Sequence, residues 1–370
     1  MKIGFDAKRA FLNASGLGNY SRNTLNALKN HHPDNQYVLF TPEINEELFS
    51  NSKQFNVISP DSSLLKLFKS LWRSFSVSRQ LKNNELDLFH GLSNELPSGI
   101  QKSKVTAIVT IHDLIFLRYP EFYKPIDRKI YYQKVKYACT AAHKIIAISN
   151  QTKEDIVEYF KINPEKIEVV FQSISPKYYE RLNTKHLESK YNLPKKFILA
   201  VGTIEKRKNQ LSLLKAIHKA QLNIPVVFVG KPTLYTTSLI QFITEKKLED
   251  RVRFLNNIKT TDLAGLYQKA SLSVYISMFE GFGLPIIESM ASGCPVITSN
   301  VSCLPETAGD AAVLCDPENI DEIGEKIKLL LENDSFRNEM IEKSKERSKL
   351  FHPEKYSQNL ISLYSKILSE

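Results

Sequence analysis

Short runs of aliphatic and β-branched residues alternate with helical periodicity along the chain. In the first half these runs lie within residues 3–5, 37–40, 86–89, 105–111 and 144–148. Strands separated by helices form parallel sheets, because the crossover between two parallel strands is long enough to hold a helix. The pattern starts again after a polar stretch, with runs within residues 197–201, 226–229, 252–255, 272–276, 295–298 and 312–315. The sequence therefore predicts an α/β fold with two doubly wound domains.

The polar stretch between the two series marks the predicted domain boundary. Residues 168–193 are mixed in character and include Pro176, which is typical of an interdomain connection. The last residues of the chain repeat apolar side chains at the spacing of one helical face. We expect a first domain at residues 1–175, a second at 176–353 and a packed terminal helix at 354–370.

Composition limits the classes of function. The 370 residues carry a formal net charge of +10, which favours an anionic partner such as nucleic acid, phospholipid head groups or a phosphorylated small molecule. Nucleic acid is the least favoured of these, because no zinc-finger spacing, RNP motif or basic zipper is present. Four cysteines form no C-x-x-C pair, so neither a disulfide framework nor a zinc site is indicated. The apolar runs are shorter than the roughly 20 residues that span a bilayer, and the N-terminus has no signal-peptide core, so we expect a cytoplasmic protein.

The most informative segment is FEGFGLPIIESMASG at residues 279–293. It predicts a glycine turn after a strand and then a helix, with Pro285 in the first helical turn. Gly281 and Gly283 allow a ligand to approach the backbone, and the free amides at the start of the helix favour a phosphate. Glu288, about one turn into the helix, could accept hydrogen bonds from a ribose diol. Spacing alone favours a simpler interpretation, a tight βα turn with solvated glutamates.

A second segment, VGTIEKRKN at residues 201–209, ends the first strand of the second domain. Its Arg207 and Lys208 could neutralise a leaving diphosphate without a metal ion. The carboxyl end of a strand is where open α/β sheets bind ligands. The alternative is a short basic loop in solvent.

The first domain contains two further candidates. Residues 15–20, SGLGNY, superficially fit a dinucleotide-binding fingerprint. We reject that interpretation, because the glycines come about ten residues after the strand and no acidic residue ends a suitable second strand. His112 follows the strand at 105–111, and a lone histidine in such a place is more often structural.

Together these segments closely resemble glycosyltransferase family four, the group 1 glycosyltransferases. The hallmark of that family is a pair of glutamates separated by seven residues, which Glu280 and Glu288 fit. The match extends through GCPVITSN at residues 293–300 and LPETAGDAA at residues 304–312. The resemblance implies the GT-B fold, in which two Rossmann-like domains face a central cleft and the C-terminal helix packs back on the N-terminal domain.

The resemblance also implies roles for individual residues. Glu280 would contact sugar hydroxyls and Glu288 the nucleoside, while His112 would approach the donor sugar. Many relatives carry an arginine where this chain has Thr203, so the phosphate role rests on Arg207 and Lys208, and these two, with Glu280 and His112, are the expected catalytic residues. The other expected donor-binding residues are Gly202, Thr203, Ser277, Gly281, Phe282, Gly283 and Leu284. A flexible loop that touches the donor phosphates or the acceptor would contain Gly16, Gly18 and Asn19.

The activity implied by the resemblance is that of a retaining hexosyltransferase that needs no metal or cofactor. Its donor would be a GDP- or UDP-linked sugar and its acceptor a glycan or a lipid-linked glycan in surface polysaccharide synthesis. Mannose is the first expectation, because the pattern Gly-Thr-x-Glu-x-Arg-Lys-Asn at residues 202–209 is common among mannosyltransferases. Two alternatives share the fold: a nucleotide-sugar epimerase or sugar phosphorylase, and a non-catalytic sugar-nucleotide-binding protein.

Residues 62–84 predict a basic amphipathic helix. Five apolar side chains share one helical face, and the segment contains no acidic residue. Its cations are Lys66, Lys69, Arg73, Arg79 and Lys82. The apolar face could pack on the sheet or dock on an anionic membrane, and the sequence favours neither. Membrane docking would place the protein peripherally at the inner face of the membrane.

Overall fold

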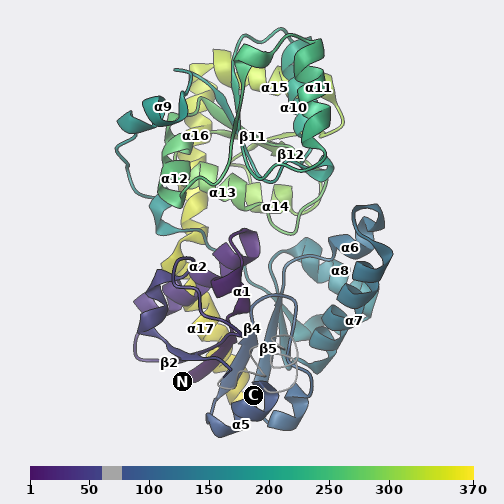
Figure 1. Cartoon of the computed structure of the whole chain (residues 1–370), viewed down its shortest axis with the longest axis vertical. Helices are drawn as coiled ribbons and strands as arrows, with labels where there is room; N and C mark the ends of the chain where they lie inside the picture. The colour runs from purple at the N-terminus through teal and green to yellow at the C-terminus, as the bar shows by residue number, and fades with distance from the viewer. Residues whose placement is uncertain (61–76) are drawn as a thin grey trace. The chain divides into compact units, whose positions relative to one another are not determined.

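The computed structural model describes residues 1–60 and 77–370 (Figure 1). The chain divides into two compact units, one formed by Met1–Ser173 with Pro353–Glu370 and the other by Ile174–His352. The division after Ser173 lies close to the boundary expected at residues 175 and 176. Each unit is built on one parallel sheet. Of the described helices, none combines the length and the apolar composition needed to cross a membrane.

The described part of the first unit contains a seven-stranded sheet in the order β3-β2-β1-β4-β5-β6-β7. The chain runs outward from β1 to β3 on one side and from β4 to β7 on the other. The carboxyl ends of β1 and β4 therefore lie at the point where the strand order reverses, the usual position of a ligand crevice in such sheets. The strands are β1 (Lys2–Asp6), β2 (Gln36–Phe40), β3 (Asn56–Ile58), β4 (Leu88–Gly91), β5 (Thr106–Ile111), β6 (Lys144–Ala147) and β7 (Ile167–Val169).

Helices cover both faces of this sheet. Successive strand side chains point to opposite faces, so Phe89 and Val109 enter one hydrophobic cluster while Leu88 and Ile108 enter another. The described helices of this unit are α1 (Lys8–Leu12), α2 (Gly16–His31), α5 (Val77–Asn83), α6 (Ile115–Arg118), α7 (Pro125–Ala141), α8 (Asn150–Phe160) and α17 (Pro353–Ser369).

The C-terminal helix α17 belongs to the first unit and joins it through a buried polar network. The hydroxyl of Tyr364 lies 2.7 Å from Nδ1 of His90, whose Nε2 lies 2.8 Å from the hydroxyl of Thr110 on β5. The hydroxyl of Tyr356 donates to that of Tyr20 on α2 at 3.0 Å. Burial lowers the pKa of His90 to about 3, so its ring is neutral at physiological pH. These bonds fix the terminal helix in one register on the sheet.

Replacing Tyr364 by Phe should lower the free energy of unfolding by about 1–3 kcal/mol, because a buried nitrogen of His90 loses its partner. The measurement is chemical denaturation of the wild-type and variant proteins. Tyr131→Phe removes the same hydroxyl from a side chain that is 42% exposed, and it should change stability by less than about 0.5 kcal/mol. Equal losses in the two variants would contradict a structural role for the buried network.

The second unit contains a six-stranded sheet in the order β10-β9-β8-β11-β12-β13. The order reverses between β8 and β11, which pair in parallel. The prediction of two doubly wound parallel sheets is thus confirmed. The strands are β8 (Ile198–Val201), β9 (Val226–Val229), β10 (Val252–Leu255), β11 (Leu272–Tyr275), β12 (Val296–Ser299) and β13 (Val313–Cys315). The helices are α9 (Lys185–Tyr191), α10 (Gln210–Lys219), α11 (Thr236–Glu245), α12 (Thr260–Lys269), α13 (Leu284–Ala291), α14 (Leu304–Ala308), α15 (Ile320–Glu332) and α16 (Asp334–Ser348).

Candidate active site

The connection from β11 to α13 forms the centre of the candidate site. Strand β11 ends at Tyr275, and α13 begins at Leu284 with Pro285 in its first turn, as the sequence predicted. Gly283 caps the helix with φ +100°, a conformation that favours glycine. A Cβ atom there would also lie 2.8 Å from a methyl group of Leu304. The glycine turn is therefore required both by backbone conformation and by close packing against α14.

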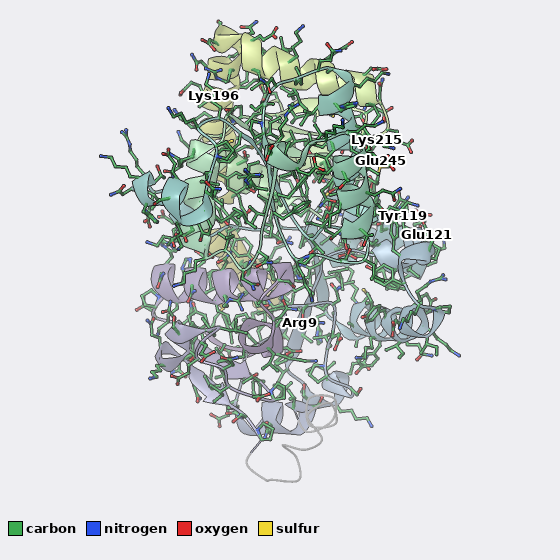
Figure 2. The ribbon with its side chains drawn as sticks, turned by 45° about the horizontal axis from the view of Figure 1, so that its top comes forward. Arg9, Tyr119, Glu121, Lys196, Lys215 and Glu245 are labelled. Carbon is green, nitrogen blue, oxygen red and sulfur yellow. The ribbon has the colours of Figure 1, made fainter. Side chains whose placement is uncertain are left out.

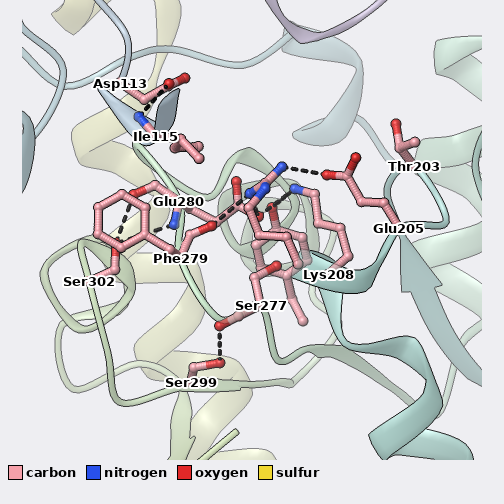
Figure 3. Close-up of polar contacts among 12 residues, drawn as sticks. Asp113, Ile115, Thr203, Glu205, Lys208, Ser277, Phe279, Glu280, Ser299 and Ser302 are labelled. Carbon is pink, nitrogen blue, oxygen red and sulfur yellow. Dashed lines mark hydrogen bonds and ion pairs between the residues drawn. The ribbon is translucent and has the colours of Figure 1, made fainter. Parts of the chain in front are cut away.

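Glu280 lies in this turn with its carboxylate between two cations. Its Oε1 lies 2.5 Å from Nζ of Lys208 and 2.7 Å from Nη1 of Arg207. The backbone of Glu280 is held by Ser302, whose hydroxyl accepts from its N–H at 3.2 Å and donates to its carbonyl at 2.7 Å (Figure 3). Glu280 is 7% exposed. The structure thus brings together three of the residues that the sequence predicted as catalytic.

The loop after β8 is tied to the same turn. Arg207 donates to the carbonyl of Phe279 at 2.6 Å and to Glu205 at 2.6 Å. Lys208 donates to the hydroxyl of Tyr275 at 2.5 Å, and its ammonium lies 4.8 Å from the centre of that ring. An ammonium has three N–H donors, and Tyr275 and Glu280 use two of them. Lys208 therefore has one donor left for a ligand oxygen.

The charges of this cluster depend on one another. Burial alone would raise the pKa of Glu280, but Lys208 and Arg207 lower it to about 2, so the carboxylate is ionised. Burial lowers the pKa of Lys208, and the neighbouring Glu280 opposes that change. A fixed cation at the carboxyl end of a strand can stabilise negative charge on a leaving phosphate without reorganisation. In this cluster the two cations, Lys208 and Arg207, are paired with two carboxylates, Glu280 and Glu205, and their role toward a diphosphate stays a prediction.

Gly202 and Thr203 lie at the carboxyl end of β8, where the sequence placed part of the donor site. Gly202 has φ +140°, and its α-carbon faces the side chain of Lys208, whose Cε would be 3.6 Å from an added Cβ. A Cβ on Gly230 would lie 1.9 Å from the carbonyl oxygen of Gly202. The ends of β8 and β9 are therefore closely packed, and Thr203 is half-buried, with its carbonyl accepting from the side-chain amide of Gln210 at 2.9 Å.

The second predicted glutamate, Glu288, has different neighbours. It lies on α13, half-buried, and accepts a hydrogen bond from the hydroxyl of Tyr267 at 3.3 Å. Burial raises its pKa to about 7, against the opposing hydrogen bonds from Tyr178 and Tyr267. Glu288 is therefore hydrogen-bonded by tyrosine hydroxyls, whereas Glu280 forms ion pairs with cations.

The raised pKa of Glu288 makes stability depend on pH. Because its pKa of about 7 in the folded protein exceeds the ordinary value of 4.5, the folded protein binds this proton more tightly than the unfolded chain. The contribution of protonated Glu288 to the free energy of unfolding is therefore fully present below about pH 4.5. It is lost as the pH rises through about 7, where the buried carboxyl ionises. The Glu288→Gln protein should therefore be more stable than wild type at pH 8, by about 1–3 kcal/mol, and equal to it at pH 4.

Thermal denaturation of both proteins at the two pH values measures this difference. Glu318→Gln, at an exposed glutamate, is the matched surface control and should change the free energy of unfolding by less than about 0.5 kcal/mol. A difference between wild type and Glu288→Gln that stays constant with pH would contradict the assignment.

The other residues predicted to bind the donor lie in the connection between β11 and α13 and include buried side chains. Ser277 is fully buried, and its carbonyl accepts from the hydroxyl of Ser299 at 2.7 Å. Phe282 is 3% exposed and packs on Phe351 with ring centres 5.9 Å apart. Gly281 and Leu284 flank it in the turn and at the first position of α13. Tyr275, Glu205 and Ser302, which contact the cluster directly, were not assigned roles from the sequence.

His112, the catalytic candidate of the first unit, follows β5 and is 5% exposed. Its Nε2 lies 2.8 Å from the carbonyl oxygen of Leu92, and its Nδ1 lies 3.2 Å from the amide nitrogen of Gln172. Since a carbonyl only accepts, Nε2 carries the proton and Nδ1 accepts from Gln172. Burial lowers the pKa of His112 to about 4. The ring is therefore neutral, and both of its nitrogens contact protein. A contact with the donor sugar stays a prediction.

Gly16, Gly18 and Asn19 lie in the first turn of α2, so the prediction that they form a flexible loop is wrong. The α-carbon of Gly18 packs so closely on the preceding segment that an added Cβ would lie 1.7 Å from the carbonyl oxygen of Asn13. Asn19 accepts a hydrogen bond from Arg22 at 2.6 Å. Gly18 thus allows the helix to begin against the chain that leads into it, whereas nothing lies within 4 Å of a Cβ added to Gly16. A contact of Gly16, Gly18 or Asn19 with phosphate or acceptor stays a prediction.

The predicted basic amphipathic helix at residues 62–84 lies mostly outside the described residues. Only its last part is described, as helix α5 (Val77–Asn83), where Val77 and Leu81 are buried in the first unit.

Two protein-family models match the sequence, one in each half of the chain. Residues 14–177 match the model described as Glycosyltransferase Family 4, and residues 183–347 match the model described as Glycosyl transferases group 1. The O-antigen chain mannosyltransferase B of Escherichia coli is 31% identical over 285 residues, which cover 75% of this chain and 74% of that protein.

Two further proteins are informative. The N-acetylgalactosamine-N,N'-diacetylbacillosaminyl-diphospho-undecaprenol 4-alpha-N-acetylgalactosaminyltransferase of Campylobacter jejuni is 31% identical over 225 residues, which cover 60% of this chain and 59% of that protein. The crystal structure of Anabaena HepE in complex with UDP superposes with a TM-score of 0.77 at 18% identity, covering 99% of this chain and 100% of that one. This likeness confirms the fold.

Proposed function

The chain belongs to the group 1 glycosyltransferases, and on that premise we propose that it is a retaining hexosyltransferase that transfers mannose from GDP-mannose to a glycan or lipid-linked acceptor in surface polysaccharide synthesis. The observation that carries the proposal is the cluster of Lys208, Arg207 and Glu280 between the end of β8 and the glycine turn before α13. Cations at the carboxyl end of a strand and free amides at the start of a helix are a suitable receptor for a diphosphate.

In the proposed reaction the bond between the anomeric carbon of the sugar and the phosphate oxygen breaks, and its electron pair passes to that oxygen. Lys208 and Arg207 stabilise the charge that develops on the leaving diphosphate. The acceptor hydroxyl attacks the same face of the sugar and passes its proton to the oxygen of the departing phosphate, so the products are the glycoside and the protonated nucleoside diphosphate. Glu280 holds both cations in place and offers its second oxygen to sugar hydroxyls, while Glu288 accepts from the ribose.

Similarity supports the choice of substrates. The Escherichia coli relative is named as an O-antigen mannosyltransferase, and the Campylobacter jejuni relative is named for a diphospho-undecaprenol acceptor. The pattern at residues 202–209 agrees with mannose as the transferred sugar. A UDP-linked sugar is the second candidate donor, because the structurally similar Anabaena HepE was crystallised in complex with UDP. The comparisons give no support to the epimerase alternative.

We further propose that the protein acts in the cytoplasm, peripherally at the inner face of the membrane. Residues 62–84 support this by their cations and their lack of acidic residues. A lipid-linked acceptor would also be presented at such a surface.

A transfer assay tests the proposed reaction. The purified protein is incubated with radiolabelled GDP-mannose or UDP-glucose and a lipid-linked oligosaccharide acceptor, and label is measured in the organic phase. We expect transfer from GDP-mannose, with NMR of the product showing the same anomeric configuration as the donor. An epimerised sugar formed without acceptor would support the epimerase, an inverted anomer would overturn the retaining mechanism, and a lack of turnover of any donor would favour the non-catalytic binding protein.

A further inference from the structure

Two buried tyrosines face the carboxyl group of Glu288 on α13. Tyr267 belongs to α12 and Tyr178 to the 3₁₀ turn Pro176–Tyr178, and the two side chains are 1% and 4% exposed. The hydroxyl of Tyr267 donates to Oε2 of Glu288 at 3.3 Å, and the hydroxyl of Tyr178 forms a second hydrogen bond with the same carboxyl group. Two segments that are distant in the sequence thus each bring one buried hydroxyl to Glu288.

The two tyrosines are themselves fixed by their neighbours. Their ring centres lie 6.1 Å apart with an angle of 70° between the planes, an edge-to-face arrangement that aromatic pairs prefer. The carbonyl of Tyr178 accepts from the hydroxyl of Ser292, the residue just after α13, at 3.4 Å. Helices α12 and α13 lie side by side in the second unit (Figure 1). The two hydroxyls therefore hold the carboxyl group of Glu288 in one orientation.

The two hydrogen bonds favour the ionised form of Glu288. Burial raises the pKa of both tyrosines, so their hydroxyls keep their protons and donate. Burial also raises the pKa of Glu288, and the hydrogen bonds from the tyrosines oppose that rise. An ionised carboxylate only accepts, and it has about four lone-pair sites. Within the described chain the tyrosines occupy two of these sites, and the others remain for a ligand.

The position of Glu288 along α13 suits contact with a ribose. A helix rises 1.5 Å per residue, so Glu288 lies about 6 Å along the axis from Leu284, the first residue of the helix. The amides at the start of this helix are the proposed phosphate site, and in a nucleotide the ribose directly follows the phosphates. The 2′- and 3′-hydroxyls of ribose are two adjacent donors, which match the acceptor sites that the tyrosines leave. A 2′-deoxyribose offers only one of these donors.

We propose that Tyr178 and Tyr267 are positioning residues that direct the remaining acceptor sites of Glu288 toward a ribose diol, and that the donor site thereby selects ribonucleotides over 2′-deoxyribonucleotides. The inference rests on the proposed function and deepens it, since it names the residues that set selectivity for the sugar of the nucleotide. A site built around hydrogen bonds to a hydroxyl rejects an analogue without that hydroxyl, because its own buried groups lose their partner. Tyrosines that only filled space beside α13 would have no effect on this selectivity.

The test is calorimetric titration of the full-length protein with GDP, 2′-deoxy-GDP, UDP and 2′-deoxy-UDP. We expect the wild-type protein to bind its preferred ribonucleotide at least about tenfold more tightly than the matching deoxyribonucleotide. Tyr178→Phe and Tyr267→Phe should each weaken binding of the ribonucleotide severalfold while leaving that of the deoxyribonucleotide unchanged, so the selectivity falls. Unchanged binding of the deoxyribonucleotide also shows that the variants are folded.

Turnover gives a second measurement that a purely structural role would not reproduce. In both tyrosine variants the KM for the donor should rise with the dissociation constant of the nucleotide, while kcat stays within about threefold of wild type, because Glu288 binds the ribose equally before and during transfer. A fall in kcat larger than the rise in KM would place the effect at the reacting sugar and overturn the assignment to the ribose.

Tyr179→Phe is the matched control, because the hydroxyl of this neighbouring tyrosine donates to the carbonyl of Ser348 at 2.8 Å. Tyr119→Phe is a second control, at a half-buried tyrosine of the first unit that Figure 2 labels. Both controls should keep wild-type selectivity.

Selectivity that is unchanged in the Tyr178 and Tyr267 variants, or lost equally in the Tyr179 variant, would overturn the inference. A wild-type protein that transfers sugar but binds ribonucleotides and deoxyribonucleotides equally would also overturn it and leave the proposed function intact. Ribonucleotide selectivity that is lost in the two tyrosine variants of a protein that transfers no sugar would overturn the proposed function and leave the positioning role intact.

Discussion

The Glu280→Gln protein should lose about 3–5 kcal/mol of its free energy of unfolding, the loss expected when one partner of a buried ion pair is removed. Glu280 is the counter-charge of two cations whose side chains are only 13% and 16% exposed. Glutamine preserves the shape of the side chain, but it leaves Lys208 and Arg207 close together without that charge. Chemical denaturation, monitored separately for the two units where their transitions differ, measures the loss.

The control for this variant is Glu180→Gln. Glu180 also contacts a lysine, Lys177 at 2.9 Å, but its side chain is 46% exposed. Exposed pairs contribute little, so this variant should lose less than about 1 kcal/mol. A Glu280→Gln protein as stable as the Glu180→Gln protein would show that the buried cluster does not depend on its carboxylate.

The second large effect is on turnover. Replacing Lys208 by Met should lower kcat by about 10²–10³-fold, the loss typical of removing one group that stabilises charge in the transition state. Methionine fills a similar volume beside Gly202 and Tyr275, and Arg207 still neutralises Glu280. The dissociation constant for the nucleoside diphosphate should change less than kcat, because the charge that Lys208 stabilises is greatest as the diphosphate departs.

Lys206→Met provides the comparison for Lys208→Met. Lys206 lies in the same loop but is exposed, so its loss should leave kcat within about threefold of wild type. If both variants lost activity equally, the loop would act through its overall charge. If Lys208→Met kept more than about a tenth of wild-type turnover, the leaving-group role would be wrong.

The sheet strands with long apolar runs could be predicted from the sequence, whereas two edge strands could not. The runs near residues 105–111 and 226–229 correspond to β5 and β9, whose side chains are buried on both faces. Strands β3 (Asn56–Ile58) and β7 (Ile167–Val169) are three residues long, and most of their side chains are only half-buried or exposed. Each of these two segments contains a polar residue, Asn56 or Glu168, and is too short to leave a continuous apolar run, whereas the edge strands β10 and β13 of the second sheet were predicted.

The sequence also predicted the members of the charged cluster but not their contacts. Lys208 and Glu280 are 72 positions apart, and they meet because β8 and β11 pair at the reversal of strand order. Tyr275 was missed because a tyrosine at the end of a buried strand is usual in any core. Its position at a strand end beside the reversal was the available signal. Gly18 was assigned to a flexible loop because its close packing on Asn13 is visible only in three dimensions.

The most direct test of the central claim is a thermal shift of the purified protein with GDP, UDP, ADP and their sugar conjugates, repeated on the Glu288→Ala and Lys208→Met variants. A ligand present at 100 times its dissociation constant stabilises the folded protein by about 2.7 kcal/mol. The account predicts selective stabilisation by one nucleotide, with GDP and GDP-mannose expected, that is lost in Glu288→Ala and weakened in Lys208→Met. No stabilisation by any nucleotide, or stabilisation that both variants retain in full, would contradict it.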